Sequence, residues 1–425
     1  MLIFFARVFF YTKETLAVIF VKRVAQFLSV LYNLIVAKTF KIKTKINRIY
    51  KNMKIPFFKK NNFLGIDFGT SSIKVVELSY KSGNAHLMNY GWIKLPTKTK
   101  ASNLDDKARD KEDSKVERYL LDLLGKMDTK SDLAHISIGG YRGLSALIKV
   151  DKSNDGDIAE IIKAEAGKHI PVSLDEVYLS WDVVSKTIPK KKIGQSEEEE
   201  IKNKFNKKKE SAEVLLVAAP KEDVRRYEEI AENAELKVKS LELDIFSVVR
   251  ALVGNDLGKF LIIDMGAKVT NLLLVEKGII KINRNISSGG NEITKNIVST
   301  LNVSWERAEA FKEKNDYMSN EGKQMVAPVL ETIAKESNRI INSYFEEEGK
   351  DRLDDVILTG GGSGINNVDK LFADIIGMSV SVGNPWKKLN IESEKIKKNN
   401  EAISRPFTVA TGLALKGVDD YKREL

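Results

Sequence analysis

Three short glycine-rich stretches lie far apart in this chain, and each of them follows or enters an apolar run that is typical of a strand. They are residues 65–74 (GIDFGTSSIK), 262–267 (IIDMGA) and 357–363 (ILTGGGS). Because glycine leaves the backbone bare, the N–H groups of such turns can converge on the oxygens of a polyanion. One stretch alone would be weak evidence, but three in this order predict a single nucleotide-binding site.

The first two stretches share a strand–turn–strand pattern, with one turn after Asp67 and the other after Asp264. Two similar halves, each with a phosphate-binding hairpin, predict a bilobed α/β protein. The nucleotide would lie in the cleft between the lobes, which is a common place for small ligands. The flanking strand-like runs are 63–66 and 73–78 in the first half, and 260–265 and 271–276 in the second.

The turn of the first hairpin combines backbone donors with hydroxyl groups. Gly69, Thr70, Ser71 and Ser72 supply N–H and O–H donors that suit a triphosphate. Lys74 could add a compact positive charge near the phosphates, and an exposed strand lysine is the alternative.

Asp67 and Asp264 occupy equivalent places in the two hairpins, and Gly266 follows the second aspartate in its turn. Two carboxylates at one cleft suit a magnesium ion that keeps most of its water ligands. A single strand aspartate could instead cap its own turn, but the paired placement favours the metal role. The hairpins therefore predict Mg²⁺, held through water, beside the phosphates.

Further candidates lie in the second half of the chain. Gly289 and Gly290 form a turn that could close on the phosphates. Glu309 and Lys312 are three residues apart and so share one face of a helix. They could hold the edges of ribose and adenine, and an ordinary surface ion pair is the alternative. The third glycine stretch would let a nucleoside face lie against bare backbone, through Gly360, Gly361, Gly362 and Ser363.

The net charge of +10 at pH 7 would suggest a nucleic-acid partner if it were spread along the chain. Residues 1–52, however, contain ten basic residues and one acidic residue, Glu14. The remaining sequence, with 59 basic and 58 acidic residues, is nearly neutral and has no electrostatic footprint for DNA or RNA. The absence of cysteine excludes disulfides, thiolate metal sites and cysteine nucleophiles.

The basic segment 1–52 has two interpretations. Lys22 and Arg23 interrupt its longest apolar stretch, whereas a membrane span needs about 20 apolar residues. A basic amphipathic segment could instead lie on an anionic membrane surface. Alternatively the segment is not translated and the chain starts at Met53, close to the first glycine stretch.

Several linked motifs resemble the superfamily of actin, DnaK-type chaperones and sugar kinases, which has two phosphate motifs and an adenosine motif in this order. Within it, the chain resembles the PilM family, actin-like proteins of type IV pilus assembly. The resemblance extends over most of the sequence after residue 52. The matching segments are 64–78 (LGIDFGTSSIKVVEL), 215–221 (LLVAAPK), 289–294 (GGNEIT), 356–364 (VILTGGGSG), 384–386 (NPW) and 407–413 (FTVATGL).

This resemblance implies an α/β fold of two actin-like lobes, each ribonuclease H-like, with a small inserted subdomain, and it implies binding of ATP with magnesium. It also implies a partner, the short cytoplasmic N-terminal tail of a PilN-like membrane protein, docked as an extended peptide near the inserted subdomain. Through PilN such a protein joins PilO and PilC at the inner face of the cytoplasmic membrane. The expected segments are an N-terminal extension (1–52), the first lobe (53–133 and 220–255), the peptide-binding subdomain (134–219) with a charged loop (186–211), and the second lobe with the adenosine motif (256–425).

One departure from the family pattern bears on activity. Where the family often has a glutamate before a Pro-Phe-Ala-like run, this chain has Asp244-Ile245-Phe246-Ser247. Asp244 is therefore the candidate to orient an attacking water, and its shorter side chain predicts slow ATP hydrolysis at most, with nucleotide mainly clamping the lobes.

The alternative function is that of an FtsA-like filament protein of cell division. FtsA ends in an amphipathic helix that tethers it to the membrane, whereas residues 419–425 of this chain are polar. Self-association is compatible with either function.

Overall fold

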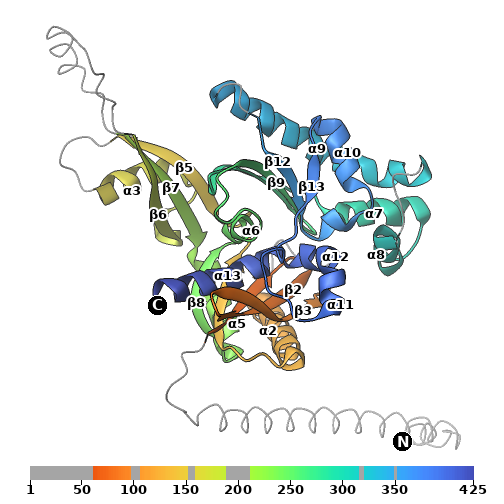
Figure 1. Cartoon of the computed structure of the whole chain (residues 1–425), viewed down its shortest axis with the longest axis horizontal. Coiled ribbons are helices and arrows are strands. Elements are labelled where there is room, and N and C mark those ends of the chain that lie inside the picture. Colours follow the sequence, from red (N-terminus) through yellow and green to blue (C-terminus); the bar gives the residue numbers. More distant parts are fainter. Residues whose placement is uncertain (1–60, 97–105, 152–157, 188–210, 315–319, 349–351) are drawn as a thin grey trace, which may run out of the picture. The chain divides into compact units, whose positions relative to one another are not determined.

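The computed structural model describes residues 61–96, 106–151, 158–187, 211–314, 320–348 and 352–425. Residues from Asn61 onward form one compact unit, which contains two five-stranded sheets and one three-stranded sheet (Figure 1). The basic segment 1–52 and most of the charged loop 186–211 lie outside the described residues.

The first five-stranded sheet has the order β3-β2-β1-β4-β8. Strands β1, β2 and β3 form an antiparallel meander, while β4 and β8 run parallel to β1. The hairpin predicted around the first glycine stretch is confirmed, and Asp67 on β1 lies opposite Lys74 on β2. The strands are β1 (Asn62–Phe68), β2 (Ser72–Lys81), β3 (Asn84–Lys94), β4 (Leu133–Ile138) and β8 (Lys237–Leu243).

The second five-stranded sheet, with the order β11-β10-β9-β12-β13, repeats this arrangement. Its first three strands are again an antiparallel meander, and β12 and β13 run parallel to β9. Asp264 and Asn271 lie opposite each other, where the first sheet has Asp67 and Lys74. The predicted duplication is thus confirmed. The strands are β9 (Lys259–Met265), β10 (Thr270–Glu276), β11 (Ile279–Ile286), β12 (Asp355–Thr359) and β13 (Val380–Val382).

Helices cover one face of each sheet. In the first lobe, Leu120 of α2 and Ile230 of α5 share a core with Ile66 of β1. In the second lobe, Leu330 and Phe372 pack in the core of the other sheet. The helices are α2 (Asp106–Met127) and α5 (Lys221–Asn233) in the first lobe, and α7 (Gly290–Leu301), α8 (Trp305–Lys314), α9 (Asn320–Glu348) and α10 (Val368–Ile376) in the second.

Two further helices cross between the lobes. Helix α6 (Asp244–Leu252) follows β8 of the first sheet, but it lies against β10 of the second sheet, and Val248 shares a core with Leu273. Helix α13 (Thr408–Arg423), at the end of the chain, lies on the first sheet, where Ala414 packs near β1 and β2 (Figure 1). The two helices also contact each other, and together they connect the two sheets.

The chain returns to the first lobe before α13 begins. Trp386 is fully buried, and its ring packs against those of Tyr90 on β3 and Phe407. The N–H of Asn390 donates to the carbonyl oxygen of Ala85 at 2.9 Å. The sequence predicts 256–425 as one lobe, but its last part instead covers the apolar face of the first sheet. The short helices on this path are α11 (Glu394–Lys398) and α12 (Asn400–Ser404), followed by a 3-10 turn (Arg405–Phe407).

The three-stranded sheet, with the order β5-β7-β6, is antiparallel and belongs to a subdomain inserted between β4 and β8. Ile162 of α3 packs against Ile148 and Leu216 of the sheet. The predicted insertion begins at 134, but β4 pairs with β1 and β8, so the inserted sheet starts after β4. The elements are β5 (Leu144–Asp151), α3 (Ile158–His169), a 3-10 turn (Leu174–Glu176), β6 (Val177–Thr187) and β7 (Ser211–Pro220).

Helix α13 approaches its neighbours through glycines. A Cβ atom on Gly65 of β1 would overlap the carbonyl oxygen of Ala410, and one on Gly412 would overlap the carbonyl oxygen of Ser247 in α6. Arg250 of α6 reinforces the contact, because its Nη1 donates to the carbonyl oxygen of Gly412 at 3.0 Å. The crossing of α6 and α13 thus requires a residue without a side chain at position 412.

His135, on β4, is a buried base whose protonation the fold opposes. Its Nδ1 lies 2.8 Å from Ser240 Oγ. Burial lowers the pKa of His135 from 6.5 to about 4, against the opposing effect of Asp420, while Lys416, Glu242 and Arg250 act more weakly. Between pH 6.5 and about pH 4, the unfolded chain binds more protons at His135 than the folded protein does. The free energy of unfolding therefore has its full value above pH 6.5 and falls by about 3 kcal/mol as the pH is lowered towards 4.

We therefore expect His135→Gln to remove most of this acid sensitivity. The measurement is the free energy of unfolding, from urea titrations of parent and variant at several pH values in this range. Asp264, described below, titrates with the opposite sign over an overlapping range, so both proteins should carry Asp264→Asn. Equal loss of stability on acidification in the two proteins would contradict the assignment to His135.

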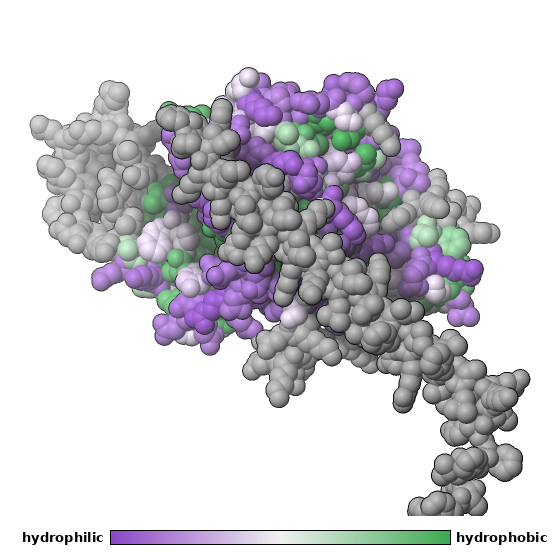
Figure 2. All heavy atoms as spheres, turned by 90° about the horizontal axis from the view of Figure 1, so that it is seen from below, coloured by the Kyte–Doolittle hydropathy of each residue, from purple (hydrophilic) through white to green (hydrophobic). Residues whose placement is uncertain are grey.

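The surface of the described residues is mostly hydrophilic where Figure 2 displays it, with apolar patches between the hydrophilic residues. Large exposed apolar side chains are scattered over separate elements, for example Trp92 on β3 and Tyr178 on β6. Among the helices of the described residues, none has the length and apolar character that a membrane span requires.

Candidate functional site

The two hairpin turns and the third glycine stretch meet at one cavity of about 90 Å³ between the lobes. The strands β9 and β12 are parallel neighbours, so the turns that follow them lie at the same edge of the second sheet. The turn after β1 reaches the cavity from the first lobe. Most of the residues predicted from sequence line this cavity, namely Asp67, Gly69, Thr70, Ser71, Lys74, Asp244, Asp264, Gly266, Gly360 and Gly361.

In the first hairpin, Lys74 is engaged by Asp67. Lys74 Nζ lies 2.9 Å from Asp67 Oδ2, and both side chains are largely buried. The other carboxylate oxygen of Asp67 accepts a hydrogen bond from Ser137 Oγ at 3.2 Å. Lys74 therefore lines the cavity rather than an exposed strand surface, and its contact with phosphate stays a prediction. Its positive charge balances Asp67 and remains next to the Gly69 turn.

In the second hairpin, Asp264 is buried beside an amide instead of a lysine. Asn271 Nδ2 donates to Asp264 Oδ2 at 3.4 Å. Burial, followed by repulsion from Asp67, raises the pKa of Asp264 from 3.8 to about 6, although Lys74 and Asn271 oppose the shift. The backbone at Gly360 has φ of +79°, and a Cβ atom there would lie 2.5 Å from Asp264 Oδ1. Only glycine lets the third stretch approach this carboxylate.

Asp244 is the first residue of α6 and a third carboxylate at the cavity. The N–H of Gly140 donates to Asp244 Oδ1 at 2.8 Å. Burial, then repulsion from Asp264 and Asp67, raises the pKa of Asp244 well above its usual value. Three carboxylates that repel one another across one cavity would be stabilised by a bound cation.

The geometry bears on how a metal ion could be held. Within the described ranges, no three acidic, histidine or cysteine side chains form a ready-made cluster of direct ligands. Carboxylate oxygens that face one cavity suit Mg²⁺, which usually keeps several of its water ligands. Asp67 and Asp264 are therefore suited to contact Mg²⁺ through water, which remains a prediction.

The remaining predicted residues are packed behind the cavity wall. The turn at Gly289 and Gly290 docks on the second hairpin, since the N–H of Gly290 donates to the carbonyl oxygen of Gly266 at 3.0 Å. Ser363 is buried, and its Oγ donates to the carbonyl oxygen of Gly360 at 2.7 Å. The predicted residues that do not line the cavity are Ser72, Gly289, Gly290, Glu309, Lys312, Gly362 and Ser363.

Glu309 and Lys312 form an ion pair, but the pair is largely buried rather than the surface pair given as the alternative to a nucleoside contact. Lys312 Nζ lies 2.7 Å from Glu309 Oε1 and also donates to the carbonyl oxygen of Gly290 at 3.2 Å. Thr294 donates to the same Glu309 carboxylate. These bonds tie α8 to the turn that supports the second hairpin, and a contact with ribose or adenine stays a prediction.

Four residues with polar side chains that line the cavity were missed by the sequence interpretation: Tyr141, Asn271, Arg405 and Thr408. Asn271 could have been found, because it stands opposite Asp264 as Lys74 stands opposite Asp67. Arg405 donates to the carbonyl oxygens of Ser363 and Glu401, both at 3.0 Å. Tyr141 directly follows Gly139 and Gly140 after β4, a glycine turn that the sequence interpretation did not use, whereas Arg405 belongs to no glycine stretch.

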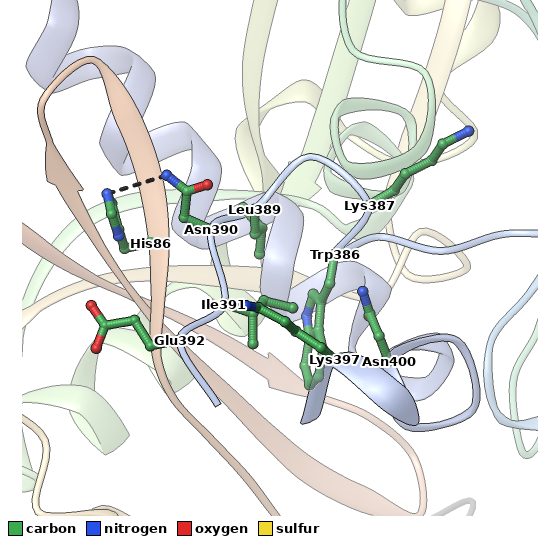
Figure 3. Close-up of a pocket in the computed structure, with 9 residues that line it drawn as sticks. All are labelled: His86, Trp386, Lys387, Leu389, Asn390, Ile391, Glu392, Lys397 and Asn400. Carbon is green, nitrogen blue, oxygen red and sulfur yellow. Dashed lines mark hydrogen bonds between the residues drawn. The ribbon is translucent and has the colours of Figure 1, made fainter. Parts of the chain in front are cut away.

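A larger hollow of about 530 Å³ lies elsewhere, between β3 and the segment that leads to α12 (Figure 3). Its residues include His86, Trp386, Asn390 and Lys397. The hollow contains none of the predicted residues and no paired carboxylates, and in Figure 3 the Lys387 amine points away from the other side chains. The predicted residues that line a cavity are therefore those of the smaller interlobe cavity.

Comparison with solved structures identifies the fold. A PilM-PilN type IV pilus biogenesis complex matches with a TM-score of 0.68 and 22% identity, covering 84% of this chain and 98% of that chain. The ethanolamine utilization protein EutJ from Carboxydothermus hydrogenoformans gives a TM-score of 0.47 and 16% identity, covering 84% and 90%. The predicted fold class, duplicated actin-like lobes with an inserted subdomain, is confirmed by the first likeness and by the two matching sheets.

Among curated proteins, the cell division protein FtsA from Enterococcus hirae is 25% identical over 192 residues. The match includes 40% of this chain and 43% of FtsA, so the chain spans less than half the length of this relative. A similarity of this extent does not favour the FtsA-like alternative.

A family model described as type IV pilus assembly protein PilM matches residues 65–418. The match includes both hairpins, the inserted subdomain, the third glycine stretch and much of α13. It therefore spans the cavity and the two helices that join the lobes. This chain belongs to the PilM family of type IV pilus assembly proteins.

Proposed function

We propose that this protein is a nucleotide-dependent scaffold of the type IV pilus assembly platform, in which ATP with Mg²⁺ clamps the two lobes. The observation that carries the proposal is the meeting of three glycine turns and three carboxylates at one interlobe cavity, in a chain of the PilM family. The turns offer backbone N–H groups to phosphates. The carboxylates favour a bound cation.

The residues around the cavity have separate roles in this proposal. The turn from Gly69 to Ser72 and the turn at Gly266 bind phosphate oxygens, while Asp67 and Asp264 hold the water shell of Mg²⁺. The bound ion neutralises phosphate charge. Asp244, fixed by the N–H of Gly140, is placed to hold a water molecule near the phosphates. Since its side chain is short and already engaged, we expect turnover to be slow.

The size of the cavity supports a clamp. Ligand sites usually enclose about 300–1,000 Å³, whereas the interlobe cavity encloses about 90 Å³. We therefore expect the lobes to separate when a nucleotide enters and to close around it afterwards. A site of this kind couples nucleotide binding to the relative placement of the lobes.

The proposed partner is the cytoplasmic tail of a PilN-like membrane protein, docked as an extended peptide at the inserted subdomain. The similarity to a PilM-PilN complex supports this partner. In the described part of the chain, β6 is an edge strand of its sheet, and Tyr178 on it is 50% exposed. An edge strand can accept an extended peptide through backbone hydrogen bonds, with side chains giving specificity.

We expect a synthetic peptide of that tail to bind, and ATP with Mg²⁺ to tighten its binding. Titration calorimetry with and without nucleotide measures both effects. Tyr178→Ala should weaken peptide binding by about tenfold if this side chain is an anchor of the interface. The control is Leu257→Ala, since Leu257 is also exposed but precedes β9 in the second lobe. Absence of peptide binding under every nucleotide condition would reject the scaffold function.

The proposed location is the inner face of the cytoplasmic membrane, reached through the PilN-like protein and, through it, PilO and PilC. Residues 1–52 lie outside the described residues, and contact of this basic segment with anionic lipid is a second proposed route. Membrane fractionation of the full chain and of a chain lacking 1–52 separates the two routes. Equal membrane fractionation of the two chains would contradict the proposed contact of residues 1–52 with lipid.

A further inference from the structure

The inserted subdomain belongs to the first half of the chain, yet it touches the second lobe. Strand β5 lies against β11 of the second sheet. Lys281 Nζ on β11 lies 3.2 Å from Glu213 Oε2 on β7, and the two side chains are only 19% and 23% exposed. A pair shielded to this degree is screened by salt less than a surface pair.

A second contact lies beside the first. Asn285, also on β11, places its Nδ2 3.5 Å from the carbonyl oxygen of Gly140. Gly140 is in the loop between β4 and β5, and its two neighbours Gly139 and Tyr141 line the interlobe cavity. The contacts of β11 with the subdomain therefore adjoin the wall of the candidate nucleotide site.

The loop between β4 and β5 also contacts the interlobe cavity and helix α5 of the first lobe. The N–H of Gly140 donates to Asp244 in the cavity. Arg142 Nε donates to Asp223 Oδ2 at 2.7 Å, and Asp223 is a buried residue of α5 in the first lobe. A shift of the inserted subdomain cannot leave this loop unchanged, because the loop is its direct connection to β4.

The small size of the interlobe cavity connects these contacts to the entry of a nucleotide. A cavity of about 90 Å³ must widen to admit a nucleotide. The lobes are joined on one side by the crossing of α6 and α13, and the pair Lys281–Glu213 joins the second lobe to the subdomain. Widening about the helix crossing would separate β11 from the inserted sheet.

We propose that Lys281 and Glu213, together with Asn285 and Gly140, form a clasp that must open for nucleotide to enter or leave. The clasp makes the position of the inserted subdomain depend on whether the cleft is open or closed. This inference rests on the proposed nucleotide site, and it identifies the part of the molecule through which nucleotide would change the surface offered to a partner.

Charge reversal tests the clasp. Lys281→Glu and Glu213→Lys each replace the attraction by repulsion, and the double variant restores an opposite pair with reversed direction. Dissociation of a fluorescent ATP analogue, followed by stopped flow with excess ATP, should be about tenfold faster in each single variant. The double variant should return to within about twofold of the parent, because the coupling belongs to the pair.

Two controls separate the clasp from general effects of charge or folding. Lys335→Glu makes the same charge change within an exposed pair of α9, at 3.2 Å from Glu331, and should leave dissociation unchanged. Lys281→Met keeps the apolar stem and removes only the charge, so it should accelerate dissociation even if the reversals fold poorly.

The outcomes distinguish this inference from the function on which it rests. If the parent protein binds no ATP analogue, the proposed function fails, and the clasp fails with it. If the parent binds but Lys281→Met and both reversals release nucleotide at the parent rate, only the clasp is overturned. Faster release in the single variants without recovery in the double variant would also overturn the pairing of Lys281 with Glu213.

Discussion

Gly412→Ala is expected to lower the free energy of unfolding by about 3 kcal/mol, near the upper end of what one added methyl group costs in a packed interior. The new Cβ atom would overlap the carbonyl oxygen of Ser247, a backbone group of α6 that cannot rotate away. Relief requires α13 to move away from α6, and Arg250 would then lose its bond to the carbonyl oxygen of Gly412. Urea unfolding followed by circular dichroism measures the loss.

A matched substitution separates packing from helix propensity. Gly167 also lies inside a helix, α3, but within the described residues no atom outside its own helix and chain neighbours comes within 4 Å of an added Cβ. Gly167→Ala should raise stability by about 0.5–1 kcal/mol, because alanine is the better helix former. If both variants shift stability in the same direction, the close approach of α13 and α6 is not the determinant.

Asp264→Asn is expected to weaken Mg²⁺-dependent ATP binding by about 10- to 100-fold, the range found when groups around a metal are removed. The same change should make the nucleotide-free protein more stable. The pKa of Asp264 is raised to about 6, so the folded state disfavours the ionised form. The protonated carboxyl group stabilises the folded protein below pH 3.8, and this stabilisation is lost as the pH rises through 6. Replacing the carboxyl group by an amide should therefore raise the free energy of unfolding near pH 7 by about 3 kcal/mol.

Opposite changes in affinity and stability distinguish a binding residue from a structural one. Calorimetric titration with ATP, in magnesium and in EDTA, measures the first, and urea unfolding without nucleotide measures the second. Asp122→Asn is the control, since Asp122 is an exposed residue of α2 paired with Lys126. Unchanged ATP affinity in Asp264→Asn would reject its proposed role, whatever happens to stability.

The sequence was informative where the structure is locally determined. The hairpin turns at Asp67 and Asp264 are specified by a few adjacent residues, and the structure places them in equivalent positions of two matching sheets. Fold class followed from this repetition. The cavity likewise contains most of the predicted residues. The turns after the parallel strands β9 and β12 share one edge of the second sheet, and the equivalent turn after β1 reaches the cavity from the first lobe.

The sequence was less informative where long-range packing decides. Arg405 reaches the cavity only because the chain returns to the first lobe after β13, and no local pattern predicts that return. Tyr141 depends in the same way on the loop that leads into the inserted subdomain. For Glu309 and Lys312 the spacing gave the shared helix face correctly, but the partners at Thr294 and Gly290 are set by the tertiary fold.

The crossing of α6 and α13 also determines how the protein unfolds. Helix α6 follows the first sheet and shares a core with the second, and α13 packs on the first sheet and against α6, so unfolding of either lobe would expose apolar surface of its neighbour. The lobes are therefore not independent domains, and from β1 to α13 we expect one cooperative transition instead of two. We therefore expect the two lobes to move relative to each other about the crossing of α6 and α13, while neither lobe unfolds alone.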